Sequence, residues 1–208
     1  MGVALTEEGK RGPLRVGVIG LGAGTLAAYG RWGDTFRFYD INPLVIDVAR
    51  HEFTFLRDSM AKIDIVPGDA RLSLEREKDD NYDLLAVDAF SGDSIPIHLL
   101  TREAFELYFK QLKPSGVLAV HVSNRYLDLV PVVRGAADRL GKQSVVVSNA
   151  PDDDREIFSS TWVLVSAEPL PYQMELMKAG EVSIAKGRRV LWTDDYSSLW
   201  SLLKTKSD

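Results

Sequence analysis

Short runs of β-branched and apolar residues alternate with helix-forming stretches along nearly the whole chain, and this alternation limits the folds open to it. The predicted strands cover residues 15–19, 36–39, 63–66, 84–87, 117–122, 143–147 and 160–166. Helix-like stretches follow from about residues 25, 43, 101, 131 and 172. Strands that alternate with helices favour a parallel sheet. The sequence therefore predicts an α/β fold with a mainly parallel seven-stranded sheet and helices on both faces.

Length and composition favour one globular domain. The 208 residues suffice for one large domain, and 45% hydrophobic with 26% charged residues is ordinary for a globular protein. Residues 1–14 are polar and are predicted to be a flexible lead-in. Because no strong linker interrupts residues 15–208, we expect a single domain there.

The charge balance and the absence of cysteine exclude several classes of function. The 25 Lys and Arg against 30 Asp and Glu give a net charge of -5, which argues against a nucleic-acid surface and suits a cationic small molecule. Without cysteine there can be no disulfide scaffold, thiolate metal site or cysteine nucleophile. No apolar run approaches the roughly 20 residues of a membrane span. We therefore expect a cytoplasmic protein with no membrane segment.

A glycine-rich turn follows the first predicted strand, and an acidic residue stands near the end of each of the next three. The turn is Gly20-Leu-Gly-Ala-Gly24, and the acids are Asp40, Asp69 and Asp88. In an open parallel sheet, ligands bind at the carboxyl ends of the strands, so these residues should line one Rossmann-like crevice. Glycines let a ligand approach the backbone, and an acid can accept hydrogen bonds from ribose hydroxyls. The alternative is a tight turn with ordinary capping acids.

The spacing of the glycines separates two kinds of nucleotide fold. A nicotinamide fingerprint, G-x-G-x-x-G, needs glycine at position 25, where the chain has Thr25. The observed G-x-G-x-G, with Asp40 and the turn 68–70, resembles the class I S-adenosylmethionine-dependent methyltransferase fold. That resemblance implies that the first acid holds the ribose and the second lies beside the adenine. The cofactor contacts that it implies are Gly20, Leu21, Gly22, Gly24, Asp40, Ile41, Asp69 and Ala70.

Longer segments resemble the spermidine synthases. Residues 82–93, Tyr-Asp-Leu-Leu-Ala-Val-Asp-Ala-Phe-Ser-Gly-Asp, are similar to their fourth strand and the loop after it, and residues 37–49 and 66–70 are similar to their ribose and adenine segments. The resemblance runs from residue 16 to about residue 166. It is closest to the spermidine synthase-like domains often fused behind transporter-like membrane segments, through residues 86–101, 120–125 and 192–197.

This resemblance implies that Asp88 is the catalytic carboxylate of an aminopropyl transfer from decarboxylated S-adenosylmethionine, without a metal, to an amine such as putrescine. An ammonium must lose a proton before it can attack the methylene beside a sulfonium, and a carboxylate within reach can bind it and accept that proton. Asp88 could instead be a loop cap or a cofactor contact. The alternative functions are an S-adenosylmethionine-dependent methyltransferase and a non-catalytic domain that binds a nucleoside or polyamine.

Two departures from the family bear on the acceptor site. The family's D-x-x-D pattern would put an aspartate at position 91, where the chain has Ser91, and the nearest substitute is Asp93. The N-terminal β-strand domain of the polyamine synthases has no counterpart in residues 1–14. Since that region contributes to their dimers, a homodimer is implied by the resemblance but left open by the sequence.

Asp194 and Asp195 stand between Trp192 and Tyr196, where charge and cation–π contact could hold a polyamine. A solvated turn before a last short helix, capped by Asp195 or Ser197, explains the same residues. No pair of the three histidines has metal-ligand spacing. His98, in the loop after the Asp88 strand, is expected to pack or to form a loop hydrogen bond.

Overall fold

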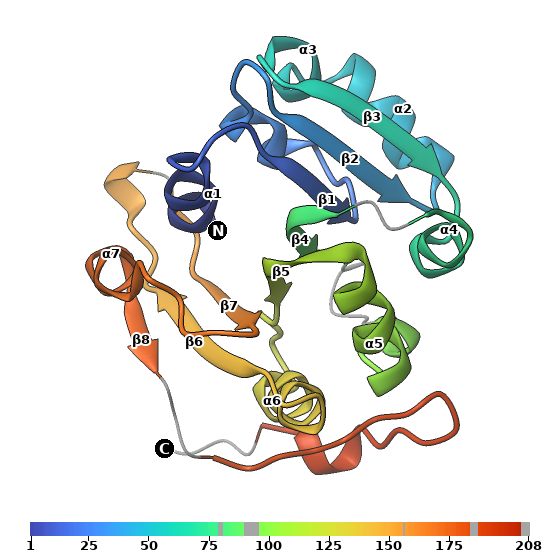
Figure 1. Cartoon of the computed structure of the whole chain (residues 1–208), viewed down its shortest axis with the longest axis vertical. Coiled ribbons are helices and arrows are strands. Elements are labelled where there is room, and N and C mark those ends of the chain that lie inside the picture. The colour runs from blue at the N-terminus through green and yellow to red at the C-terminus, as the bar shows by residue number, and fades with distance from the viewer. Residues whose placement is uncertain (79–80, 90–95, 156, 184–186, 205–208) are drawn as a thin grey trace. The chain divides into compact units, whose positions relative to one another are not determined.

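The protein is described by a computed structural model that covers residues 1–78, 81–89, 96–155, 157–183 and 187–204 (Figure 1). It divides into two compact units. Unit 1 comprises residues 1–89 and 107–118, and unit 2 comprises residues 90–106 and 119–208. The single domain over residues 15–208 stays a prediction.

Within the residues that the structure describes, eight strands follow the hydrogen-bonded order β3-β2-β1-β4-β5-β7-β6-β8. Strand β1 pairs in parallel with β2 and β4, and β2 pairs in parallel with β3, whereas β6 runs antiparallel to β7 and β8. The Rossmann-like α/β class is thus confirmed, with one strand more than the seven predicted. The strands are β1 Arg15–Ile19, β2 Thr35–Asp40, β3 Lys62–Pro67, β4 Tyr82–Val87, β5 Leu112–His121, β6 Gln143–Asn149, β7 Ser160–Ser166 and β8 Glu181–Ser183.

The α-helices that begin at residues 43, 102, 130 and 173 match predicted ones, whereas those that begin at residues 2, 55 and 70 have no predicted counterpart. The stretch after the glycine-rich turn is a short 3-10 helix, Thr25–Tyr29, and so is the tail segment Trp200–Leu202. Helix α2 begins at the predicted residue 43, with Asn42 accepting the Leu44 N–H at 3.0 Å, and it ends at His51. The α-helices are α1 Gly2–Gly9, α2 Pro43–His51, α3 Phe55–Asp58, α4 Ala70–Arg76, α5 Arg102–Gln111, α6 Val130–Arg139 and α7 Gln173–Ala179. The remaining 3-10 helices are Ile97–Leu99 and Asp153–Arg155.

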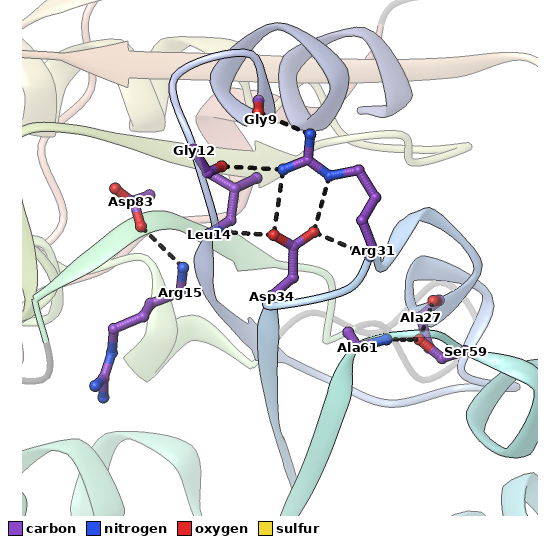
Figure 2. A network of polar contacts seen from close by, with 10 residues as sticks. All are labelled: Gly9, Gly12, Leu14, Arg15, Ala27, Arg31, Asp34, Ser59, Ala61 and Asp83. Carbon is purple, nitrogen blue, oxygen red and sulfur yellow. Dashed lines mark hydrogen bonds and ion pairs between the residues drawn. The ribbon is translucent and has the colours of Figure 1, made fainter.

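The prediction of a flexible lead-in is wrong, because helix α1 occupies most of residues 1–14 and buries Ala4 and Leu5. The Arg31 guanidinium donates to the carbonyls of Gly9 at 2.7 Å and Gly12 at 3.1 Å (Figure 2). A side chain on Gly9 would collide with that guanidinium. Tertiary contacts of this kind stabilise short helices that are marginal by themselves. Sequence periodicity alone therefore gives no sign of α1.

Strand β2 lies at the centre of the packing in unit 1, and both α2 and α4 contact it (Figure 1). The Tyr39 hydroxyl donates to Glu77 at 2.6 Å, at the end of α4, and lies 2.7 Å from the Tyr82 hydroxyl. Arg37 forms ion pairs with Asp64 and Glu77 on the same side of the strand. This partly buried polar network holds α4 on the sheet and so fixes the start of α4 near the carboxyl ends of β2 and β3.

The tail of unit 2 lies along helix α6. The Val190 N–H donates to the Pro131 carbonyl at 3.0 Å, and a side chain on Gly135 would meet the Val190 carbonyl oxygen at 2.1 Å. Glycine at this position therefore lets the tail cross the helix closely. Within the described residues, no helix is both long enough and apolar enough to cross a membrane.

Candidate functional site

The ends of β1 and β4 meet at Gly20. Its φ is +97°, in the region that favours glycine, and a side chain there would lie 2.3 Å from the Asp88 carbonyl oxygen. The Gly20 N–H donates to the Tyr39 carbonyl at 2.8 Å, and the Asp88 N–H donates to the Ile19 carbonyl at 2.8 Å. Only glycine fits where these three strand ends come together.

The rest of the turn carries two further glycines with left-handed backbone, Gly22 with φ +53° and Gly24 with φ +82°. The Gly24 N–H donates to the Leu21 carbonyl at 2.9 Å, and a side chain on Gly24 would meet Leu56 of α3 at 2.8 Å. A side chain on Gly22 would have no atom within 4 Å. The backbone at Gly22 is therefore open, as close approach of a ligand requires.

Asp40 ties this turn to the end of β2. Its Oδ2 accepts the Leu21 N–H at 2.9 Å, and its Oδ1 accepts the Asn42 N–H at 2.9 Å. Each oxygen of an ionised carboxylate can accept about two hydrogen bonds, so both keep capacity for a ligand hydroxyl. The carboxylate is half-buried, and Ile41 beside it is 71% exposed. Together they offer acceptors for a ribose and an apolar surface for a base.

Asp69 caps a helix, in agreement with the alternative interpretation of the strand-end acids. Its side chain caps α4 by accepting the Leu72 N–H at 2.9 Å, and Ala70 is the buried first residue of that helix. The Gly68 N–H donates to the Asp40 carbonyl at 2.9 Å, which joins the ends of β2 and β3. The signal was present, since an aspartate before a helix-forming stretch is a typical N-cap.

Asp88 directly follows β4 and is half-buried. Burial lowers the pKa of the Met1 amino group and the negative charge of Asp88 raises it, so the start of α1 lies within electrostatic reach of this carboxylate. The ends of four neighbouring strands thus bring Gly20, Asp40, Asp69 and Asp88 to one edge of the sheet in unit 1. Their roles in binding and catalysis stay predictions.

The other residues predicted to bind the acceptor amine fall into two groups, one outside the described residues and one in unit 2. Ser91 and Asp93 lie outside the described residues. In unit 2, the Asp194 carboxylate accepts a hydrogen bond from the Thr101 hydroxyl at 2.7 Å. The backbone N–H of Asp194 donates to the Glu103 carboxylate at 3.1 Å. Asp195 is exposed.

The aromatic half of that predicted cluster needs a correction. Trp192 is fully buried, so it offers no ring face to a polyamine, whereas Tyr196 is exposed. Residues 193–196 form a turn, in agreement with the alternative interpretation. However, neither Asp195 nor Ser197 caps the short 3-10 helix that follows, whose N-cap position is Leu199.

Two histidines lie in different settings, and the packing or loop hydrogen bond expected of the His98 side chain stays a prediction. His98 is exposed, and its carbonyl accepts a long hydrogen bond from the Thr101 hydroxyl at 3.4 Å. His121 stacks on Trp162 with ring centroids 4.8 Å apart. Across the described ranges, no group of three or more His, Asp or Glu side chains could hold a metal ion.

Comparisons with known proteins place the fold. No family model matches the chain. The structure is similar to a probable spermidine synthase from Corynebacterium glutamicum, with a TM-score of 0.68, 16% identity and coverage of 95% of this chain and 81% of that one. It is also similar to human methyltransferase-like protein 13 in complex with SAH, with a TM-score of 0.61, 21% identity and 86% of each chain covered. The chain therefore has the fold shared by spermidine synthases and class I methyltransferases.

One curated sequence adds a closer relation. The chain is 36% identical over 115 residues to a polyamine aminopropyltransferase of Vibrio vulnificus. The match covers 52% of this chain and 38% of that protein, so the chain spans well under half of the relative's length.

Proposed function

We propose that the chain transfers an aminopropyl group from decarboxylated S-adenosylmethionine to an amine such as putrescine. The observation that carries this proposal is the meeting of the turn 20–24 with Asp40, Asp69 and Asp88 at one sheet edge. The relation to an aminopropyltransferase and the fold shared with spermidine synthases support this reaction class.

The strand-end residues are suited to hold an adenosyl sulfonium. Asp40 has spare acceptor capacity for ribose hydroxyls, and the exposed Ile41 side chain gives the adenine an apolar surface. Open backbone at Gly22 lets the ligand lie close to the turn. Three carboxylates at one edge also favour a positively charged sulfonium and a positively charged amine over neutral ligands.

In the proposed reaction, the co-substrate supplies an electrophilic methylene bonded to the sulfonium. Asp88 binds the acceptor ammonium, orients it and takes up its proton, which leaves a neutral nitrogen with a free electron pair. That pair forms the new C–N bond while the C–S bond breaks, and the sulfur leaves as a neutral thioether.

A methyltransferase is the second candidate, because the same fold occurs in human methyltransferase-like protein 13 in complex with SAH. The two functions use the same contacts at Gly20, Asp40 and Asp69 and differ in the group attached to the sulfonium. A domain that binds the nucleoside without turnover is the third. Calorimetry with S-adenosylmethionine and with its decarboxylated form, each with and without putrescine, separates the three.

The expected result is tighter binding of the decarboxylated form, enhanced by putrescine, together with formation of the aminopropylated amine. Tighter binding of the carboxylated form would defeat the aminopropyl proposal and favour methyl transfer. Binding without product from any of a panel of amines would favour the non-catalytic domain.

Asp88→Asn tests the catalytic carboxylate directly. We expect transfer to fall by about 10² or more, while co-substrate affinity changes by less than about threefold, because the amide cannot accept the proton. The matched control is Asp153→Asn, which removes an exposed carboxylate of unit 2 and should leave transfer unchanged. Undiminished transfer by Asp88→Asn would exclude this role.

Three finer expectations belong to the same proposal. They are a homodimer, a cytoplasmic location, and membership of the group found behind transporter-like segments. Sedimentation velocity on the purified chain tests the first, and a monomer would exclude it for this chain.

A further inference from the structure

Unit 2 contains a pocket of about 200 Å³ between the start of α6 and the tail of the chain. Pro131 and Arg134 of α6 line one side, with Asp128 just before the helix, and Arg188 and Leu202 line the other. None of these residues takes part in the proposed transfer.

Arg134 is the unusual member of this lining. The residue is 5% exposed, yet no carboxylate of the described residues forms an ion pair with it. Its hydrogen bond, to the Ser183 carbonyl, is long at 3.4 Å. Buried charges are normally paired, since an unpaired one loses hydration without compensation. A guanidinium carries five donors, so Arg134 has donors left for a ligand.

Asp128 and Asp138 act on Arg134 through their charge, but neither forms an ion pair with it, and each has another partner. Asp128 accepts the Val130 N–H at 3.2 Å, and Asp138 forms an ion pair with Arg189. Burial lowers the pKa of Arg134 and the positive charge of Arg189 lowers it further, and together these outweigh the opposite effect of Asp128 and Asp138. An anion in the pocket would relieve both costs at once.

A second guanidinium stands at the same pocket. The Arg188 Nη1 donates to the Ser201 carbonyl, which anchors this side chain while its other donors stay available. The side chains of Pro131 and Leu202 give the pocket apolar walls. Two guanidinium groups beside an apolar surface are suited to a ligand that has an anionic group attached to a short hydrocarbon chain.

We propose that this pocket binds a small organic monocarboxylate. Arg134 and Arg188 hold the carboxylate, and the hydrocarbon part packs on Pro131 and Leu202. Guanidinium and carboxylate groups match as planar, bidentate partners. A singly charged head suits the pocket better than a dianion, because Asp128 also lines it.

The test is calorimetric titration of the full chain with sodium butyrate, against sodium chloride at the same ionic strength. For so few non-hydrogen atoms we expect saturable binding with a Kd on the order of 1 mM. Arg188→Gln should weaken it about tenfold or more, and Arg134→Gln should remove it. Arg139→Gln is the matched control, since it removes an exposed arginine at the end of α6 that does not line the pocket, and it should bind as the wild type does.

Several results would overturn the proposal. These are no saturable butyrate binding, unchanged affinity in both Arg134→Gln and Arg188→Gln, or tighter binding of inorganic phosphate than of butyrate. If Arg134→Gln does not fold, Arg188→Gln decides alone. Asp40→Asn should leave butyrate binding intact, so this site can fail or succeed independently of the proposed transferase site.

Discussion

Strand β2 has an aspartate at each end, and the two are bonded very differently. Asp34, just before the strand, is 2% exposed and accepts hydrogen bonds from the Leu14 N–H at 2.8 Å and from the Arg31 N–H, Nε and Nη2 at 3.0, 3.0 and 3.2 Å (Figure 2). Asp40, at the carboxyl end, is half-buried and accepts one backbone N–H on each oxygen.

The difference indicates what each carboxylate is for. Four hydrogen bonds saturate the acceptor capacity of Asp34, so it joins α1, β1 and β2 and has nothing left for a ligand. Asp40 is oriented by two hydrogen bonds and keeps capacity on the side where parallel sheets bind ligands. Asp34 at the amino edge of this sheet therefore serves stability, whereas binding is the role that we propose for Asp40 at the carboxyl edge.

Gly20→Ala should have the largest effect on stability, because the carboxyl edge depends on close backbone approach. The new methyl would lie 2.3 Å from the Asp88 carbonyl oxygen, on a residue with φ +97°. We expect a loss of about 4 kcal/mol or more in the free energy of unfolding, measured with urea. Gly22→Ala, with open space around it, should lose only about 1 to 2 kcal/mol through its left-handed backbone. Equal losses would refute the close approach.

Asp34→Asn should have the next largest effect. The amide NH₂ would face the N–H groups that now donate to the carboxylate, and Arg31 would lose its negatively charged partner. We therefore expect the free energy of unfolding, measured with urea, to fall by roughly 2 to 3 kcal/mol. Asp47→Asn changes an exposed carboxylate on α2 and should show little change. Co-substrate affinity should stay the same in both variants. A stable Asp34→Asn protein with weakened binding would reverse the assignment of the two ends.

The pH dependence of stability gives a smaller, independent check. Burial raises the pKa of Asp34, but hydrogen bonds from Arg31 and Leu14 outweigh it, so the pKa lies below its ordinary value of 3.8. As the pH falls, Asp34 therefore binds a proton in the unfolded chain before it does in the folded one. Its contribution to the free energy of unfolding is complete above its ordinary pKa and is lost as the pH falls through its pKa in the folded protein. The difference in unfolding free energy between wild type and Asp34→Asn should be constant well above pH 3.8 and shrink as the pH falls below it. A difference that does not shrink would contradict this.

Sequence patterns predict the carboxyl edge better than the amino edge, for a physical reason. Turn glycines and strand-end acids sit close together in the sequence of each β–turn–α step, so local patterns suffice to assign 20–24, Asp40, Asp69 and Asp88 to one edge. The link of Asp34 to Arg31 and α1 is a tertiary arrangement with no local period. Helix α1 and the short strand β8 escape prediction because neither carries an amphipathic pattern of sufficient length.

The same reasoning explains the outcomes outside unit 1. Trp192, Asp194 and Asp195 are close in sequence and so suggest one cluster. In the structure the Trp192 indole is buried, whereas Asp194 and Asp195 are exposed. Arg134 could not be singled out, because an arginine in a helix is ordinarily solvated and the burial of this one depends on tertiary contacts.

Asp40→Asn should have the smallest effect on stability and the clearest effect on binding. The amide oxygen can still accept one of the two backbone N–H groups, and water can reach the other at this half-buried site, so we expect a loss within about 1 kcal/mol. The amide nitrogen has no acceptor for a ribose hydroxyl, and the site loses a negative charge that favours the sulfonium. Calorimetry should therefore show at least about tenfold weaker binding of decarboxylated S-adenosylmethionine. If affinity is unchanged while stability falls as far as in Asp34→Asn, then both ends of β2 are structural, and the ligand must be held by groups other than Asp40.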